Sequence, residues 1–267
     1  MSNLSENEKK KYVRQIILDN VGIRGQEKLK ESKILVVGSG GLGSSVLYYL
    51  ASSGVGALGI IDKDLVEYSN LNRQIIHFEK DVGKSKTQSA KEKLSLLNKD
   101  ITINTYQFEI NSLNAESIIA DYDFIVEASD NFETKFLVND TCVKLGKAFT
   151  IAGVMKFEGQ IMTVIPKFSA CYRCVFSEIP EPGTYPNSCE LGIMGTTAGF
   201  FGIIEANEAI KYILFNDSDS INDKLLVNKI LYVDLESNLF DTIIIQKNEE
   251  CTACGKAKKH RYFESLT

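Results

Sequence analysis

Short runs of apolar, β-branched residues alternate, along the first 155 residues, with segments whose apolar positions recur at helical spacing. The first run, 33–38 (KILVVG), ends in glycine and leads into a helical pattern over 42–53. Further strands are predicted at 57–62, 101–106, 123–128 and 148–153, and helices at 84–98, 112–120 and 132–145. Alternating strands and helices form right-handed βαβ units, so the pattern predicts an α/β fold with a mostly parallel, Rossmann-like sheet.

The pattern changes after Gly153. A strand over 159–166, a long helix over 195–215 and two close strands at 231–234 and 241–246 are predicted, and the strands are expected to extend the sheet in an antiparallel direction. Segments 166–188, which holds all four prolines, and 216–223 are predicted to be loops. We expect one domain over 1–267, with a helical N-terminal segment (1–32) and two halves (33–155 and 156–267).

Charge and hydropathy exclude several classes of protein. The net charge of −5 argues against a nucleic-acid binder, because such proteins usually carry a basic field. The most apolar late stretch, 199–215, contains Glu205, Glu208 and Lys211, too many charges for a membrane span. Residues 1–11 lack the apolar core of a secretory signal, so a cytoplasmic protein is predicted. Its six cysteines are then expected to be reduced, and their spacing indicates metal binding or chemistry.

A glycine-rich loop follows the first predicted strand. Residues 38–43 (GSGGLG) match G-x-G-x-x-G and open a helix, where backbone N–H groups can hold phosphate. Asp62 ends the next strand, 19 residues past Gly43, where an acid usually binds a ribose hydroxyl. The arrangement predicts nucleotide binding over a purely structural glycine turn, but it does not separate NAD from ATP.

Two cations follow the second strand. Arg73 lies in 69–74 (SNLNRQ) and Lys86 in 83–86 (GKSK). Fixed cations suit a triphosphate, whose charge moves onto pyrophosphate when the α-phosphorus is attacked, and a dehydrogenase has no such need. Alternatively, both side chains are solvated surface charges.

Four of the cysteines form two C-x-x-C pairs, at 171 and 174 and at 251 and 254. Each pair can place two thiolates on one metal, and four thiolates make a closed, structural zinc site. A redox dithiol and free thiols are the alternatives, although a thioredoxin-type pair is expected at a strand-to-helix turn. Cys142, inside a predicted helix, is interpreted as a core residue, and His77 and His260 as structural.

In this order the motifs resemble the ubiquitin-activating-like (E1-like) adenylyltransferase family, specifically the ThiF/MoeB (HesA/MoeB/ThiF) type. The resemblance covers nearly the whole chain and includes segment 14–16 (RQI), the glycine loop, and segment 129–131 (SDN) after the fourth strand. It implies a Rossmann-like sheet with a Cys₄ zinc site, carrying an enzyme that uses MgATP to activate the terminal glycine of a ubiquitin-like sulfur-carrier protein ending Gly-Gly. The product is an acyl-adenylate, and pyrophosphate leaves. Residues 33–155 would be the nucleotide-binding half and 156–267 the carrier-binding half.

The resemblance also implies a role for individual residues. ATP-binding residues would be Gly38, Gly40, Gly41, Leu42, Gly43, Asp62, Asp64, Asn70, Arg73, Gln74, Lys86, Asp130 and Asn131. Asp62 would hold the ribose, Asn70, Arg73 and Lys86 the phosphate chain, and Asp130 the Mg²⁺. Asp130 follows a predicted strand, where open α/β sheets place ligands, and a carboxylate there can bind Mg²⁺. It could instead, or also, cap the helix that begins at Phe132.

Two further residues have roles that the resemblance alone implies. Arg14 resembles an arginine that is delivered into the neighbouring subunit's site, which implies a homodimer. Cys189 lies where related enzymes can form a covalent sulfur intermediate, although its spacing to Gly192 is one residue shorter than the usual family pattern. The alternative for Cys189 is a helix-cap or loop position.

The sequence leaves alternatives for the identity of the carrier protein and for the class of enzyme. The region around Cys189 favours the carrier of thiamine thiazole biosynthesis over that of molybdopterin synthase, and the sulfur donor would be a cysteine desulfurase or a rhodanese. The glycine loop and Asp62 alone would also permit an NAD-dependent oxidoreductase. A noncatalytic carrier-binding scaffold is disfavoured because Arg73, Lys86 and Asp130 are present.

Overall fold

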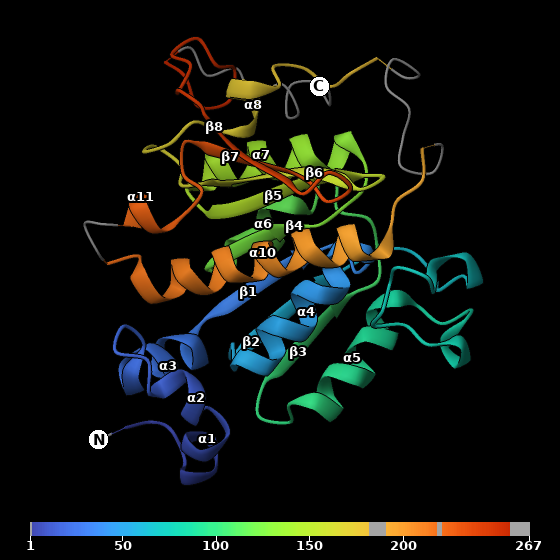
Figure 1. Cartoon of the computed structure of the whole chain (residues 1–267), viewed down its shortest axis with the longest axis vertical. Helices are drawn as coiled ribbons and strands as arrows, with labels where there is room; N and C mark the ends of the chain where they lie inside the picture. Colours follow the sequence, from blue (N-terminus) through green and yellow to red (C-terminus); the bar gives the residue numbers. More distant parts are fainter. Residues whose placement is uncertain (1, 182–190, 218–220, 257–267) are drawn as a thin grey trace.

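The computed structural model describes residues 2–181, 191–217 and 221–256, and their strands form one eight-stranded sheet in the order β3-β2-β1-β4-β5-β6-β7-β8 (Figure 1). The first five strands pair in parallel: β1 (Lys33–Val37), β2 (Ala57–Ile61), β3 (Thr102–Tyr106), β4 (Phe124–Glu127) and β5 (Ala148–Met155). The last three are antiparallel: β6 (Glu158–Val164), β7 (Lys229–Asp234) and β8 (Leu239–Ile244). The predicted fold class is confirmed.

Helices cover both faces of the sheet, and β1 shows why. Its Ile34 and Val36 belong to a core that includes residues of α4 (Gly41–Ser53), α5 (Lys86–Leu97) and α10 (Gly195–Phe215). Leu35 and Val37 belong to the opposite core, with residues of α6 (Ala115–Ala120) and α7 (Phe132–Leu145). Successive side chains of a strand point to opposite faces, so a strand buried on both faces is apolar at every position.

Helix α10 packs closely against α4, the helix that follows the glycine loop. A Cβ on Gly202 would lie 2.4 Å from the carbonyl oxygen of Leu42 and 2.2 Å from Oγ of Ser45. Only glycine permits this approach. The amino end of α10 is thereby held beside the amino end of α4.

The short helices are where the sequence-based predictions fail. The predicted loop 166–188 contains α8 (Tyr172–Val175), and the predicted loop 216–223 overlaps α11 (Ile221–Lys224). The 3₁₀ turns η1 (Tyr68–Asn70) and η2 (Glu79–Asp81) were not predicted either. A single turn is too short to show helical periodicity. Among the described residues, no helix has the length and apolar character needed to cross a membrane.

Three N-terminal helices precede β1: α1 (Glu6–Lys11), α2 (Val13–Ile16) and α3 (Gly22–Glu31), and Leu29 of α3 belongs to the same core as α4 and α10. In Figure 1 they lie together in dark blue, at the end of the molecule opposite α8.

Candidate functional site

A cavity of about 780 Å³ opens where β1, β2 and β4 end. Open α/β sheets bind their ligands at the carboxyl ends of the strands, beside the point where the strand order reverses. Here that point lies between β1 and β4. Of the predicted site residues, the wall includes Gly38, Gly40, Gly41, Leu42, Asp62, Asp64, Arg73, Gln74, Lys86, Asp130 and Asn131.

The glycine loop turns tightly between β1 and α4. Gly38 has a φ of +96°, and a Cβ there would lie 2.8 Å from the carbonyl oxygen of Ala128. A Cβ on Gly43 would lie 2.0 Å from the carbonyl oxygen of Gly38. Gly43 thus packs behind the loop and does not line the cavity, unlike Gly38.

Asp62 closes the glycine loop from β2. Its Oδ2 accepts hydrogen bonds from the backbone N–H of Ser39 (2.8 Å) and from Ser39 Oγ (2.9 Å). Its Oδ1 accepts one from the N–H of Asp64 (2.9 Å). The carboxylate predicted to hold a ribose therefore also fixes the loop that precedes α4.

Both predicted cations lie on the cavity wall. Lys86 is the first residue of α5 and only 7% exposed, and its Nζ lies 2.9 Å from Oδ2 of Asp64. Arg73 is half-buried, and its Nη1 donates to the carbonyl of Ser69 at 3.0 Å. The interpretation of Lys86 as a solvated surface charge is wrong, because so little of its side chain meets water.

The predicted set also contains two uncharged polar residues, Asn70 and Gln74. Asn70 is buried away from the cavity, and its Oδ1 accepts from the N–H of Glu67 at 3.1 Å. Gln74 lines the cavity, and its buried Oε1 has no hydrogen-bond partner among the residues that the structure describes. A buried acceptor on a cavity wall needs a donor from water or from a ligand.

Asp130 lies just past β4 and is exposed at the cavity. The helix cap is its neighbour Asn131, whose Oδ1 accepts from the N–H of Thr134 at 2.9 Å. The alternative that Asp130 caps α7 is therefore wrong, and its carboxylate is available to the cavity.

A buried ion pair beneath Asp130 was not predicted. Lys135, on α7, pairs with Glu127 and donates to the carbonyls of Ser129 (2.9 Å) and Ala152 (2.6 Å). Burial raises the pKa of Glu127, and the contact with Lys135 opposes the rise. The pair fixes the end of β4 from which Asp130 projects. A sequence signal existed, because Glu127 is a charged residue in an otherwise apolar strand.

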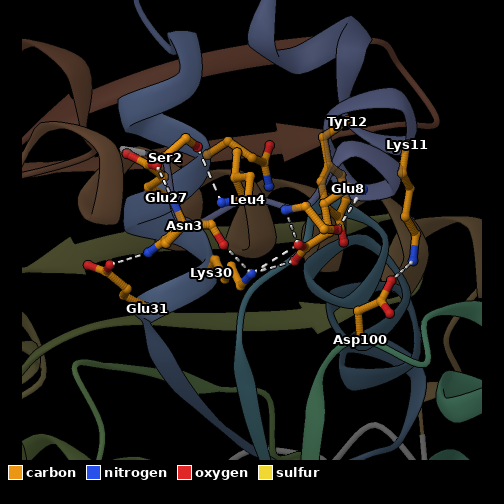
Figure 2. A network of polar contacts seen from close by, with 12 residues as sticks. Ser2, Asn3, Leu4, Glu8, Lys11, Tyr12, Glu27, Lys30, Glu31 and Asp100 are labelled. Carbon is orange, nitrogen blue, oxygen red and sulfur yellow. Dashed lines mark hydrogen bonds and ion pairs between the residues drawn. The ribbon is translucent and has the colours of Figure 1, made fainter.

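The N-terminal helices are anchored by a polar network (Figure 2). Lys30 of α3 lies 2.8 Å from Oε1 of Glu8, and Glu8 also completes a capping box with Ser5. Burial raises the pKa of Glu8, but hydrogen bonds from Lys30 and Ser5 outweigh it and lower the pKa to about 2. Arg14 lies on α2 (Val13–Ile16), and it is exposed and outside the wall of the cavity of its own chain.

The four paired cysteines meet in one cluster, and their Sγ atoms all lie within 4.8 Å of one another. The Sγ of Cys171 lies 3.6 Å from that of Cys251, and the Sγ of Cys174 lies 3.4 Å from that of Cys254. Tetrahedral zinc with bonds of about 2.3 Å separates its sulfur ligands by about 3.8 Å, so the donor set fits zinc. The prediction that the two pairs form one site of four thiolates is consistent with this cluster.

Of the other cysteines and histidines, the structure describes Cys142 and His77, and neither belongs to this cluster. Cys142 is fully buried in α7, as predicted. Cys189 and His260 lie outside the described residues. His77 is buried behind the glycine loop, with Nε2 3.0 Å from the carbonyl oxygen of Ser39.

Comparison with known proteins identifies the family of this chain. Residues 12–253 match the ThiF family. The chain is 39% identical over 246 residues to the SAMP-activating enzyme E1 of Haloferax volcanii. This match covers 92% of this chain and 88% of that protein. It is also 39% identical to the sulfur carrier protein adenylyltransferase of Thermus thermophilus, over 94% of this chain and 92% of that one.

More distant or longer proteins extend the comparison. The adenylyltransferase and sulfurtransferase MOCS3 of Culex quinquefasciatus is 40% identical, but the match spans 57% of its length. The crystal structure of E. coli MccB with MccA-N7isoASN has the same fold, with a TM-score of 0.80 at 24% identity over 96% of this chain and 76% of that one. Because residues 12–253, most of the chain, match the ThiF family, this chain belongs to that family.

Proposed function

We propose that this protein is an ATP-dependent adenylyltransferase that activates the C-terminal glycine carboxylate of a ubiquitin-like sulfur-carrier protein. The observation that carries the proposal is the convergence of Asp62, Arg73, Lys86 and Asp130 on one cavity beside the glycine loop. The names of its relatives support the same reaction class, since they include a sulfur carrier protein adenylyltransferase.

The groups on the cavity wall suit attack at the α-phosphorus of ATP. A carboxylate oxygen of the carrier forms a bond to phosphorus, and the bond to the leaving pyrophosphate breaks. The nucleophile is already an anion and needs no general base, so catalysis consists of positioning and charge stabilisation. Arg73 and Lys86 would stabilise the charge that develops on the phosphates. Asp130 would hold Mg²⁺, because its carboxylate faces the cavity and Mg²⁺ prefers oxygen ligands; bound Mg²⁺ neutralises phosphate charge.

We infer that the cavity also receives a second substrate beside the nucleotide. Its wall continues from the glycine loop onto β5, β6 and β7, where Gly153, Gly159 and Tyr232 line it. Gln74 Oε1 provides an unsatisfied acceptor on the nucleotide side. We assign the strand-lined part to the glycine-rich tail of the carrier.

The thiamine-pathway carrier is the proposed substrate, with the small subunit of molybdopterin synthase as the alternative. The choice rests on Cys189, whose thiolate would attack the acyl-adenylate to form a thioester with release of AMP, or would take the outer sulfur of a persulfide on the donor, whose own thiol then leaves. A cysteine desulfurase or a rhodanese would supply the sulfur. The cysteine cluster would bind structural zinc, since four thiolates leave no open coordination position.

The test is carrier-dependent exchange of pyrophosphate into ATP, run with each candidate carrier. Asp130→Ala and Arg73→Ala are expected to abolish exchange and keep the fold, because each removes a group at the phosphates. Asp121→Ala is the matched control, since Asp121 is exposed at the end of α6 and does not line the cavity. Undiminished exchange in both site variants, or calorimetric binding of NAD without binding of ATP, would overturn the proposal.

A further inference from the structure

His77 makes two hydrogen bonds behind the glycine loop, and both ring nitrogens are engaged. The residue is 3% exposed; Nε2 lies 3.0 Å from the carbonyl oxygen of Ser39, and Nδ1 lies 2.9 Å from Oγ of Ser89. A carbonyl oxygen can only accept a hydrogen bond, so the hydrogen must sit on Nε2. In the neutral ring Nδ1 is then an acceptor, and the hydroxyl of Ser89 must donate to it.

The contacts of Ser89 with Lys93 also require the Ser89 hydroxyl to donate to Nδ1 of His77. Nζ of Lys93 lies 2.8 Å from Oγ of Ser89, and it also pairs with the fully buried Asp81. An ammonium group has only donors, so Ser89 accepts from Lys93 and keeps its own hydrogen for His77. Burial is the largest of the effects that lower the pKa of His77, to about 4, so the ring is neutral near pH 7. One tautomer alone satisfies every contact.

This tautomer determines which way one peptide of the glycine loop faces. The C=O and N–H of a trans peptide point in opposite directions, so a Ser39 carbonyl that faces His77 turns the N–H of Gly40 to the other side. Gly40 lines the cavity. If this peptide rotated, a carbonyl oxygen would face the anionic phosphates in place of an N–H group, and affinity would fall.

We propose that His77 is a positioning residue: it holds the Ser39–Gly40 peptide so that its N–H faces the phosphates of the bound nucleotide. The inference rests on the proposed function of the glycine loop. It assigns His77 a role in nucleotide affinity, whereas a core histidine would affect stability alone. Asp62 supports the same geometry from the other side, because it holds the N–H and Oγ of Ser39.

The first experiment compares the binding of ATP and of adenosine to the full chain by calorimetry. His77→Leu fills the space without a donor, and we expect it to weaken ATP binding about tenfold, the effect of losing one hydrogen bond, with adenosine binding within twofold of wild type. His77→Gln retains an N–H donor and should recover most of the affinity for ATP. Unchanged ATP binding in His77→Leu, or equal weakening of ATP and adenosine, would overturn the inference.

A second pair of measurements covers the case in which His77→Leu does not fold. Ser89→Ala removes the donor to Nδ1 and should give a smaller, ATP-selective loss of affinity. The ¹⁵N resonances of the ring in the wild-type protein should show hydrogen on Nε2; hydrogen on Nδ1 would refute the proposed geometry. Lys86→Met, measured in parallel, separates the two proposals. If Lys86→Met weakens ATP binding and neither His77→Leu nor Ser89→Ala does, only the role of His77 fails; if none of them does, the nucleotide site itself is wrong.

Discussion

Lys86 and Asp64 form an asymmetric ion pair on the cavity wall: the side chain of the lysine is 8% exposed and that of the aspartate 53%. The backbone strengthens the link, since the N–H of Lys86 donates to the carbonyl oxygen of Asp64 at 3.0 Å. The ammonium is thus held in position at the first residue of α5. A preorganised cation costs little reorganisation when negative charge develops beside it.

Lys86→Met is therefore expected to lower kcat/KM for pyrophosphate exchange by about 100-fold or more, the usual effect of removing one electrostatic group from an active site. Steady-state exchange kinetics measure this directly. Lys84→Met is the matched control, because Lys84 is 42% exposed, pairs with Glu92 and does not line the cavity. Equal effects in both variants would argue that general surface charge, and no specific contact, supports the reaction.

If Arg14 acts in the active site of a second copy, as the family resemblance implies, inactive variants should complement each other. Arg14 is exposed on α2 and does not line its own cavity, so we expect it to act in the site of a second copy. Arg14→Ala and Asp130→Ala should each be inactive alone. After mixing and subunit exchange, half of the dimers carry both variants and each has one complete site, so about a quarter of wild-type exchange should return. No recovery, in a mixture shown to exchange subunits, would place Arg14 outside the reaction.

The buried pair of Lys135 and Glu127 predicts a large effect on stability. Lys135→Met leaves Glu127 without its cation, and the free energy of unfolding should fall by about 3 kcal/mol in urea titrations. Glu127→Gln added to Lys135→Met should recover part of the loss. Lys144→Met breaks an exposed pair with Glu116 and should cost less than about 1 kcal/mol. Similar decreases in the free energy of unfolding of Lys135→Met and Lys144→Met would contradict the expectation that the buried ion pair contributes more than the exposed one.

The cysteine cluster predicts one bound zinc per chain, detectable by elemental analysis. Cys254→Ser should lower the zinc content and the Tm by more than about 5 °C, because structural metal binding contributes directly to folding. The Kd for ATP of the folded variant should stay within twofold of wild type, since Cys254 does not line the cavity. A metal-free protein with an unchanged Tm would show that the thiols pack without an ion.

The buried neutral ring of His77 predicts a pH dependence of stability. Its pKa in the folded state is about 4, below the ordinary value of 6.5, so the unfolded chain binds the extra proton between these values. Stability from this group is complete above pH 6.5 and decreases as the pH falls toward 4, by as much as about 3 kcal/mol. Urea unfolding of wild type and His77→Gln across this range should show a smaller dependence in the variant. Identical pH profiles would mean that His77 titrates normally.

Local signals made the sheet and the glycine loop predictable. The strand before Gly38 is apolar on both faces, and α7 and α10 were placed at their observed bounds, because their patterns depend on neighbouring residues only. Arg73, Lys86 and Asp130 were found because they occur in segments that, in this order, resemble the motifs of a known family. Their convergence on one cavity required the sheet to bring the ends of β2 and β4 together.

The contacts that support the site depend on tertiary structure, and the sequence alone did not reveal them. His77 reaches Ser39 from 38 positions away, and Lys135 reaches Ala152 from 17. Neither contact follows from a motif or a period. Sequence reasoning interpreted His77 as structural because a histidine without a partner motif gives no indication of which carbonyl its ring will meet.

The thiol cluster also has a consequence for the order of biosynthesis. Cys251 lies 80 positions after Cys171, and it follows β8, the last strand of the sheet. A ribosome therefore completes every strand that the structure describes before it releases the second pair of thiols, whereas the five parallel strands are finished by residue 155. Capture of a metal at this cluster would therefore be a late event, after synthesis of the strands that form the nucleotide-binding edge of the sheet.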